Sequence, residues 1–167
     1  VPISPGVEKS PLIAHELDLE SFAIYLNTAR GYSAIGSSFT EQQQREFAEA
    51  CEMCDFDSST DILVHGALLI NLANPLKGFN SVRDKSIRLM ETEIKKCAQL
   101  GIRLYNFHPG STVKKCSRDE GIKLIGEGIN QVHKSTSDTD VITVIECMAG
   151  QGSVLGGDLK DLRDIIN

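Results

Sequence analysis

Short apolar runs alternate with longer amphipathic patterns along the 167-residue chain. Four runs have the length and composition of buried parallel strands, which carry little polar alternation: 21–26 (SFAIYL), 61–65 (DILVH), 102–108 (IRLYNFH) and 141–146 (VITVIE). A helical pattern lies between each run and the next, as a parallel connection requires. The alternation predicts an α/β fold whose strands are covered on both faces.

The helical patterns have recognisable starts, stripes and stops. Thr40 is a candidate N-cap for a helix over 41–54, and Gly101 ends the pattern over 81–100. Apolar residues at helical spacing predict two more helices over 118–134 and 158–167, and a weaker one over 7–18 because of Pro11. Together they describe a βα series.

Such a series closes either as a doubly wound sheet or as an eight-stranded barrel. Neither a Rossmann fingerprint nor a P-loop follows any predicted strand. We therefore predict a partial (β/α)8 TIM barrel of about four to five parallel βα units, with residues 1–167 as one truncated domain. Because the last helical pattern is still running at residue 167, we expect the natural protein to continue; a naturally shortened relative is the alternative.

Composition excludes some functional classes. The formal net charge of −6 argues against a protein that coats nucleic acid by bulk electrostatics, so any contact with nucleic acid should be local. Five cysteines, an odd number without a small-domain framework, favour a reducing compartment. With no apolar stretch of membrane-spanning length and no signal-peptide pattern, we expect an intracellular protein without a membrane partner.

Three side chains with metal-ligand chemistry come at the ends of successive predicted strands. His65 ends the second run, His108 the third and Glu146 the fourth. Neighbouring parallel strands are about 4.8 Å apart, so side chains from their carboxyl ends can meet on one ion. Two imidazoles and a carboxylate form a zinc ligand set with a position open for water or substrate. The alternative is three separate polar residues, solvated or capping the next helix.

Three sequence blocks resemble the endonuclease IV family of abasic-site endonucleases, most closely its eukaryotic members. The blocks are LVHGALLINLANP (63–75), KKCAQLGIRLYNFHPGST (95–112) and VIECMAGQGSVLGG (144–157). The likeness runs from about residue 20 to the end. It implies a zinc-dependent enzyme of base excision repair that hydrolyses the phosphodiester on the 5′ side of an abasic site in double-stranded DNA, in a barrel that carries three zinc ions.

The resemblance also assigns roles to individual residues. His65 and His108 would ligate one zinc, and Glu146 would bridge that zinc to a second ion and take part in catalysis. Arg30, Leu69, Lys114 and Lys115 would contact DNA, Leu69 as an apolar wedge at the missing base. This chain would supply at most one partial zinc site, because the family takes its other ligands from later strands. A missing C-terminal half or a second chain would complete the barrel.

The chain departs from the family pattern at several positions. Its first residues lack the expected histidine, Leu68 replaces an aromatic wedge, and Cys147 and Met148 replace an Asn-Thr pair. These departures keep a second reading open, a catalytically incomplete DNA-binding or scaffold half-barrel. A third is a metal-dependent sugar isomerase on a related barrel. For a eukaryotic protein, we expect the nucleus, with the mitochondrion as the alternative.

Overall fold

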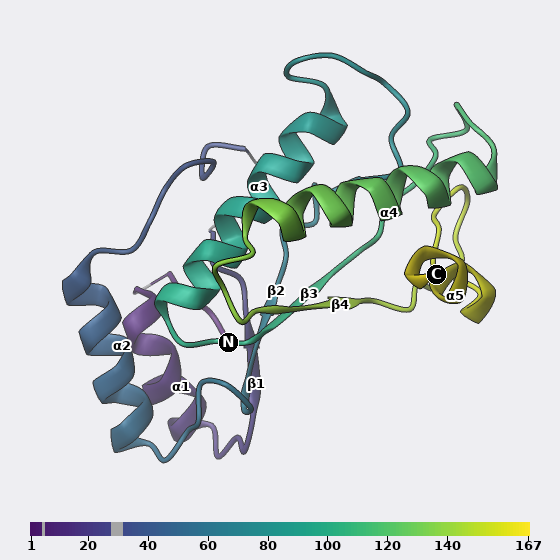
Figure 1. The fold of residues 1–167 in the computed structure, drawn as a ribbon. Coiled ribbons are helices and arrows are strands. Elements are labelled where there is room, and N and C mark those ends of the chain that lie inside the picture. The colour runs from purple at the N-terminus through teal and green to yellow at the C-terminus, as the bar shows by residue number, and fades with distance from the viewer. Residues whose placement is uncertain (5, 28–31) are drawn as a thin grey trace.

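Four parallel strands and their connecting helices make up the computed structural model, which describes residues 1–4, 6–27 and 32–167 (Figure 1). A short 3-10 helix, η1 (Val7–Lys9), precedes the first α-helix. The elements that follow are α1 (Ser10–Glu16), β1 (Phe22–Ile24), α2 (Glu41–Met53), β2 (Ile62–His65), α3 (Val82–Gln99), β3 (Leu104–Phe107), α4 (Arg118–Ser135), β4 (Ile142–Ile145) and α5 (Leu159–Ile166). All four predicted strands and all five predicted helices are therefore present, with shorter strands.

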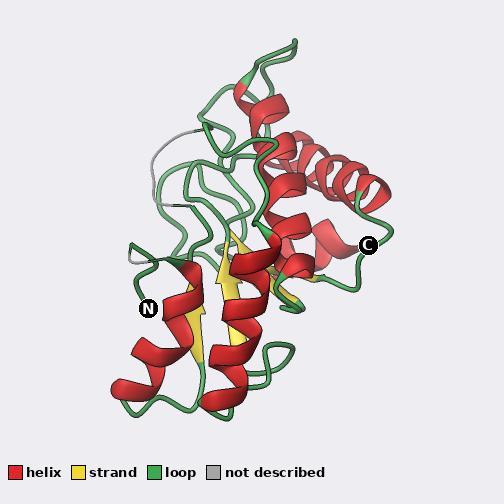
Figure 2. Cartoon of the chain, turned by 90° about the vertical axis from the view of Figure 1, so that its left-hand side faces the viewer, coloured by secondary structure: helices red, strands yellow, loops and turns green. Residues whose placement is uncertain are grey.

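The strands pair in the order in which they occur in the chain, β1-β2-β3-β4, and every pairing is parallel. This open series of βα units is a partial TIM barrel, as predicted. The loops that follow the strands gather beyond their carboxyl ends, where barrel enzymes assemble their sites (Figure 2). The described helices do not combine the length and the apolar composition that crossing a membrane requires.

Polar side chains cap the helices where the sequence places them. The Thr40 hydroxyl accepts a hydrogen bond from the Gln43 backbone N–H, and the Gln43 side chain completes a capping box at the start of α2. Ser81, Ser117 and Asp158 accept backbone hydrogen bonds at the starts of α3, α4 and α5. Each helix start following β1, β2, β3 and β4 is thus fixed by its own sequence.

The two faces of the sheet differ. The face that carries Ile24, Val64 and Tyr105 packs against the helices and is almost completely buried. The opposite face, here called the inner face, carries Ala23, Leu63, Leu104 and Ile142 at one level of the strand register.

The prediction that every strand is covered on both faces is wrong for β4. Ile142 is 50% exposed and Val144 is 36% exposed. Both lie on the inner face, on a strand that in the described chain pairs only with β3. Four strands curve too little to fill that face with their own side chains, so an apolar sequence there remains in contact with solvent.

Candidate metal centre

The strand register brings three predicted ligands to one end of the sheet. His65 is the last residue of β2, whereas His108 and Glu146 directly follow β3 and β4. The Glu146 N–H donates to the Phe107 carbonyl at 3.1 Å, so backbone pairing continues to the glutamate. All three side chains extend the inner-face alternation, and they therefore point to the same side.

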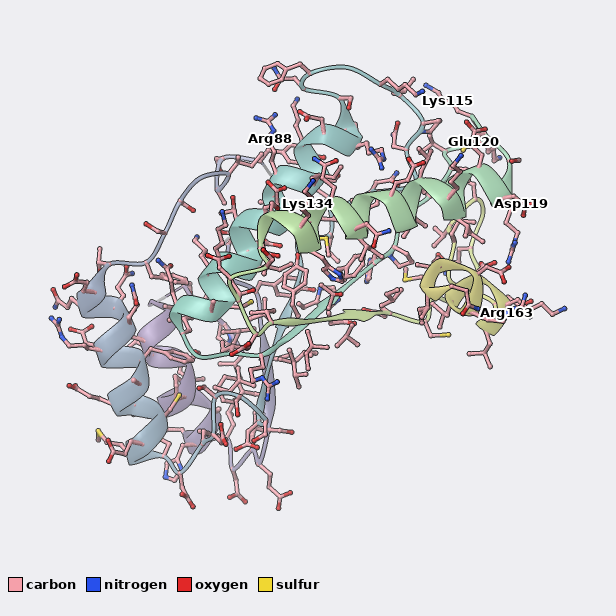
Figure 3. The ribbon with its side chains drawn as sticks, viewed as in Figure 1. Arg88, Lys115, Asp119, Glu120, Lys134 and Arg163 are labelled. Atoms are coloured by element: carbon pink, nitrogen blue, oxygen red, sulfur yellow. The ribbon has the colours of Figure 1, made fainter. Side chains whose placement is uncertain are left out.

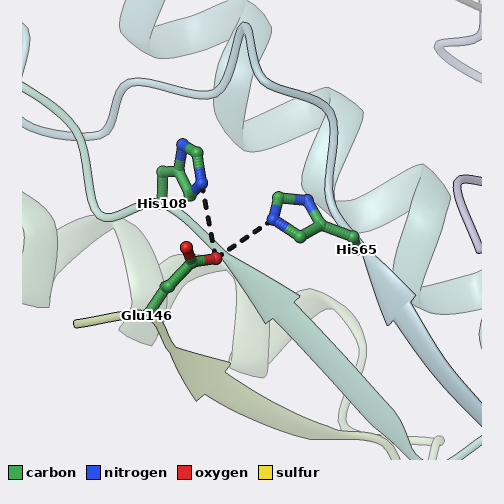
Figure 4. Close-up of side chains that lie close together, drawn as sticks. All are labelled: His65, His108 and Glu146. Carbon is green, nitrogen blue, oxygen red and sulfur yellow. Dashed lines mark hydrogen bonds and ion pairs between the residues drawn. The ribbon is translucent and has the colours of Figure 1, made fainter. Parts of the chain in front are cut away.

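Glu146 lies between the two imidazoles (Figure 4). Its Oε2 is 3.0 Å from His65 Nε2 and 3.3 Å from His108 Nε2. One candidate ligand atom from each residue lies within 4.8 Å of the others. The side chains are partly exposed, at 17% for His65, 26% for His108 and 37% for Glu146, so an ion and a substrate could both reach them.

The donor set fits zinc. Zinc holds nitrogen and oxygen ligands at about 2.0–2.2 Å in a tetrahedron, which separates the ligand atoms by roughly 3.3–3.6 Å. The two measured separations fall within or just below that range. His65 Nδ1 lies 2.8 Å from the Gly66 carbonyl oxygen, which can only accept, so Nδ1 carries a proton. Nε2 of His65 is then the ring atom that faces Glu146, as a metal ligand requires.

A hydrogen bond and two neighbouring rings keep Glu146 ionised. Although partial burial alone would raise its pKa, the Asn106 side chain donates to Oε2 at 2.7 Å, and His108 and His65 lie beside the same oxygen. The net effect lowers the pKa of Glu146 below its usual value. A carboxylate held in its charged form is ready to bind a cation.

Two residues of this site were not singled out from the sequence. Asn106 stands two residues before His108, so strand alternation places both on one face, and that spacing was the available signal. Tyr25 follows β1, is 43% exposed, and has its ring centroid 4.9 Å from that of His65. No comparable indication in the sequence placed Tyr25 at the site, because aromatic residues are common in strands.

The predicted DNA-contacting residues occupy the loops that follow the strands. Leu69, 36% exposed, lies in the loop after β2. Lys114 and Lys115 are exposed in the loop after β3, and Lys115 lies at the same end of α4 as Asp119 and Glu120 (Figure 3). Arg30 lies outside the described residues. These roles in DNA binding remain predictions.

The loops after β3 and β4 are joined to each other. The Thr112 N–H donates to the Ser153 carbonyl at 3.1 Å, and the Leu155 N–H donates to the Gly110 carbonyl at 2.9 Å. The hydroxyls of Ser111 and Ser153 lie 2.8 Å apart. The loops that carry His108 and Glu146 are therefore one hydrogen-bonded unit.

Comparison with known proteins agrees with the motifs. The chain is 44% identical over 164 residues to apurinic-apyrimidinic endonuclease 1 of Plasmodium falciparum, an alignment that covers 98% of this chain and 26% of that protein. It is 37% identical over 145 residues to the protein of the same name from Schizosaccharomyces pombe, with 87% of this chain and 40% of that protein covered. The chain thus spans between 26% and 40% of the length of these two curated relatives.

Solved structures show the same fold. Endonuclease IV from Thermus thermophilus aligns with a TM-score of 0.77 at 20% identity, over 98% of this chain and 55% of that chain. A D-tagatose 3-epimerase-like protein aligns with a TM-score of 0.67 at 16% identity, over 89% and 52% respectively. The family described as xylose isomerase-like TIM barrel matches residues 12–167. The comparisons confirm the resemblance inferred from the motifs, and the chain belongs to the xylose isomerase-like TIM barrel family.

Proposed function

We propose that the intact protein is a zinc-dependent DNA-repair endonuclease that hydrolyses the phosphodiester 5′ to an abasic site. The observation that carries the proposal is the meeting of His65, His108 and Glu146 at the carboxyl ends of three successive strands. The curated relatives, which are named apurinic-apyrimidinic endonucleases, support the choice of substrate.

In this proposal, the chain's own residues hold and orient the ions. His65 and His108 would each offer one Nε2, and Glu146 would offer a carboxylate oxygen. Zinc, when bound, lowers the pKa of a water molecule and stabilises charge on the phosphate oxygens. Asn106 holds Glu146 Oε2 at 2.7 Å, and Tyr25 covers the His65 ring, so both limit ligand movement.

The loops around the centre would bind the DNA. Leu69 would enter the space left by a missing base, and the neighbouring Leu68, 63% exposed, would add apolar surface. Lys114, Lys115 and Arg30 would neutralise phosphates, and their few charges agree with a local contact by a protein of net charge −6. Such an enzyme acts inside the cell, where we propose that it meets nuclear or mitochondrial DNA.

Zinc stoichiometry and incision of a synthetic abasic duplex test the proposal. Both should be measured on the intact protein and on its Glu146→Gln variant, because glutamine keeps the shape of the side chain but lacks its charge. We expect bound zinc and strand incision in the parent and a loss of at least about 100-fold in incision in the variant.

Two controls sharpen this experiment. Glu49→Gln removes an exposed charge from α2 and should leave incision unchanged. An undamaged duplex should remain uncut. A protein that binds no zinc, or whose Glu146→Gln variant cuts at the parental rate, would contradict the proposal. Metal-dependent conversion of a ketose would instead favour the sugar isomerase alternative, whose only support here is a shared fold.

A further inference from the structure

A buried carboxylate lies behind the candidate metal centre. Glu93, in α3, is only 1% exposed. Its Oε1 accepts from Asn27 Nδ2 at 2.6 Å, and its Oε2 accepts from the Ala67 N–H at 3.2 Å and the Tyr105 hydroxyl at 2.6 Å. Of these donors, Asn27 follows β1, Ala67 follows β2 and Tyr105 lies in β3. A buried charge is tolerated only when it is paired or hydrogen-bonded, so Glu93 ties three strands to one helix.

Lys96, three residues further along α3, completes this polar group. It is 6% exposed, its Nζ donates to Asn27 Oδ1 at 3.0 Å, and it lies 4.9 Å from the centre of the Phe39 ring. Burial raises the pKa of Glu93 and lowers that of Lys96, and the charge of each opposes the shift in the other. Such a group is expensive to bury, and hydrophobic residues would fill the same space at lower cost.

The contact between Glu93 and Ala67 leads directly to a candidate ligand. The Ala67 N–H and the Gly66 carbonyl belong to the same peptide group, which is planar. Its N–H donates to Glu93, and its carbonyl oxygen accepts from His65 Nδ1 at 2.8 Å. A carboxylate on the N–H polarises the peptide and makes its carbonyl a stronger acceptor. The orientation of this peptide therefore sets the direction of the His65 ring.

We infer that Glu93 is a positioning residue, which acts through the Gly66–Ala67 peptide to hold the His65 ring with Nε2 toward Glu146. It also fixes the start of the Leu68–Leu69 segment. The inference rests on the proposed function, because it assigns Glu93 to the metal centre of that enzyme. Partners that orient a metal-binding histidine through its second nitrogen usually change metal affinity 10- to 100-fold when they are removed.

Zinc affinity of the intact protein, measured by competition with a chromogenic chelator, tests the inference with three variants. Glu93→Gln keeps a weaker acceptor and should lower the affinity by about 3- to 10-fold, whereas Glu93→Met should lower it by about 10- to 100-fold. Tyr105→Phe is the matched control, since it removes the 2.6 Å hydrogen bond to the same carboxylate oxygen but leaves the 3.2 Å Ala67 contact in place. Its affinity should stay within about 2-fold of the parent.

A second readout needs no metal. In the metal-free parent, nuclear magnetic resonance should detect a protected proton on His65 Nδ1 and a downfield, slowly exchanging Ala67 amide. Both signals should weaken in Glu93→Gln and persist in Tyr105→Phe. If Glu93→Met does not fold, Glu93→Gln and these spectra still decide the question.

Two outcomes would overturn the inference. One is an unchanged His65 Nδ1 proton together with parental zinc affinity in Glu93→Gln. The other is an equal loss of affinity in Glu93→Gln and Tyr105→Phe, which would indicate a merely structural carboxylate. If the parent itself binds no zinc, the proposed function fails, and the metal-free spectra test the role of Glu93 separately.

Discussion

Single residues set the geometry of the candidate centre through atoms outside the ligand set. Glu146 Oε2, the oxygen that faces both imidazoles, accepts a hydrogen bond from the Asn106 side chain. The Gly66 carbonyl orients the His65 ring through a hydrogen bond from Nδ1. Gly110 belongs to this group because it lets the loop after His108 pass close to the loop after β2. The Ser111 N–H donates to Asn71 Oδ1 at 2.9 Å, which joins the two loops.

Replacing Gly110 by alanine should separate crowding from backbone strain. Gly110 has φ +120°, and an added Cβ would collide with Asn71 Oδ1 and lie 3.1 Å from Leu72 N. Gly78 has φ +117° but nothing within 4 Å of such a Cβ. We expect Gly78→Ala to cost about 1–2 kcal/mol of unfolding free energy and Gly110→Ala at least about 2 kcal/mol more. Urea unfolding measures both, and equal losses would refute the crowding argument.

The pH dependence of stability should carry the signature of Glu93. Burial raises the pKa of Glu93 above the unfolded value of about 4.3, so between these two values the folded protein binds more protons than the unfolded chain. The stability contributed by this group is full below about pH 4.3 and falls as pH rises through the folded pKa. The stability deficit of Glu93→Gln relative to the parent should therefore shrink with rising pH. Urea titrations at several pH values test this, and a constant deficit would contradict it.

At the scale of elements, a buried carboxylate paired with a partly exposed arginine anchors the joined loops to two helices. The Asp161 carboxylate, in α5, accepts from the Gly156 N–H at 2.8 Å and from Arg118 Nε of α4 at 2.7 Å. Gly156 in turn accepts from the Met148 N–H at 2.9 Å, close to Glu146. The position of the glutamate thus depends on how α5 packs against α4.

Asp161→Asn should loosen this anchor. Asp161 is 7% exposed, and losing its charge weakens a buried hydrogen bond from the Gly156 N–H and a partly buried one from Arg118, so we expect a cost of about 1–3 kcal/mol. Asp119→Asn is the control, because Asp119 pairs with the same arginine but has a 90% exposed side chain, and it should cost less than about 0.5 kcal/mol. Faster hydrogen exchange at Gly156 and Leu155 in the first variant alone would locate the effect. Similar behaviour of the two variants would refute it.

Sequence patterns predicted the elements and the meeting of the three candidate ligands, but not the polar groups behind them. Strand runs and helix caps are local signals, and the placement of His65 at a strand end follows directly from them. Glu93 is harder because an acid on a helix usually faces solvent. It lies four residues after Leu89 and four before Cys97, both fully buried, so its position in the apolar stripe was a visible sign. Its partners could not be predicted, since they come from three distant segments.

For the whole molecule, the exposed inner face is the dominant feature. Ile142 and Val144 present apolar surface on β4. In the described chain β4 pairs with β3 along one edge, and its other edge pairs with no strand. Exposed edges that carry apolar side chains are templates for association between molecules.

Polar substitutions at the exposed inner-face positions of β4 should improve solubility and change the unfolding free energy little. Val144→Lys should lower concentration-dependent association of the 167-residue chain, measured by light scattering, because a charged edge resists pairing. Ile142→Thr should change the unfolding free energy by no more than about 0.5 kcal/mol, whereas Ile62→Thr, on the buried face, should cost about 2 kcal/mol or more. Equal costs for the two threonine variants would show that the inner face is covered in solution.

The sequential order of the strands has a consequence for how the protein is made. Each strand pairs with the one synthesised just before it, and no described pairing skips a neighbour. A nascent chain can therefore add one βα unit at a time as it leaves the ribosome, and translation sets the pace of sheet growth. The three candidate ligands come together only when Glu146 emerges, some 81 residues after His65, so this group cannot form until the fourth strand has been made.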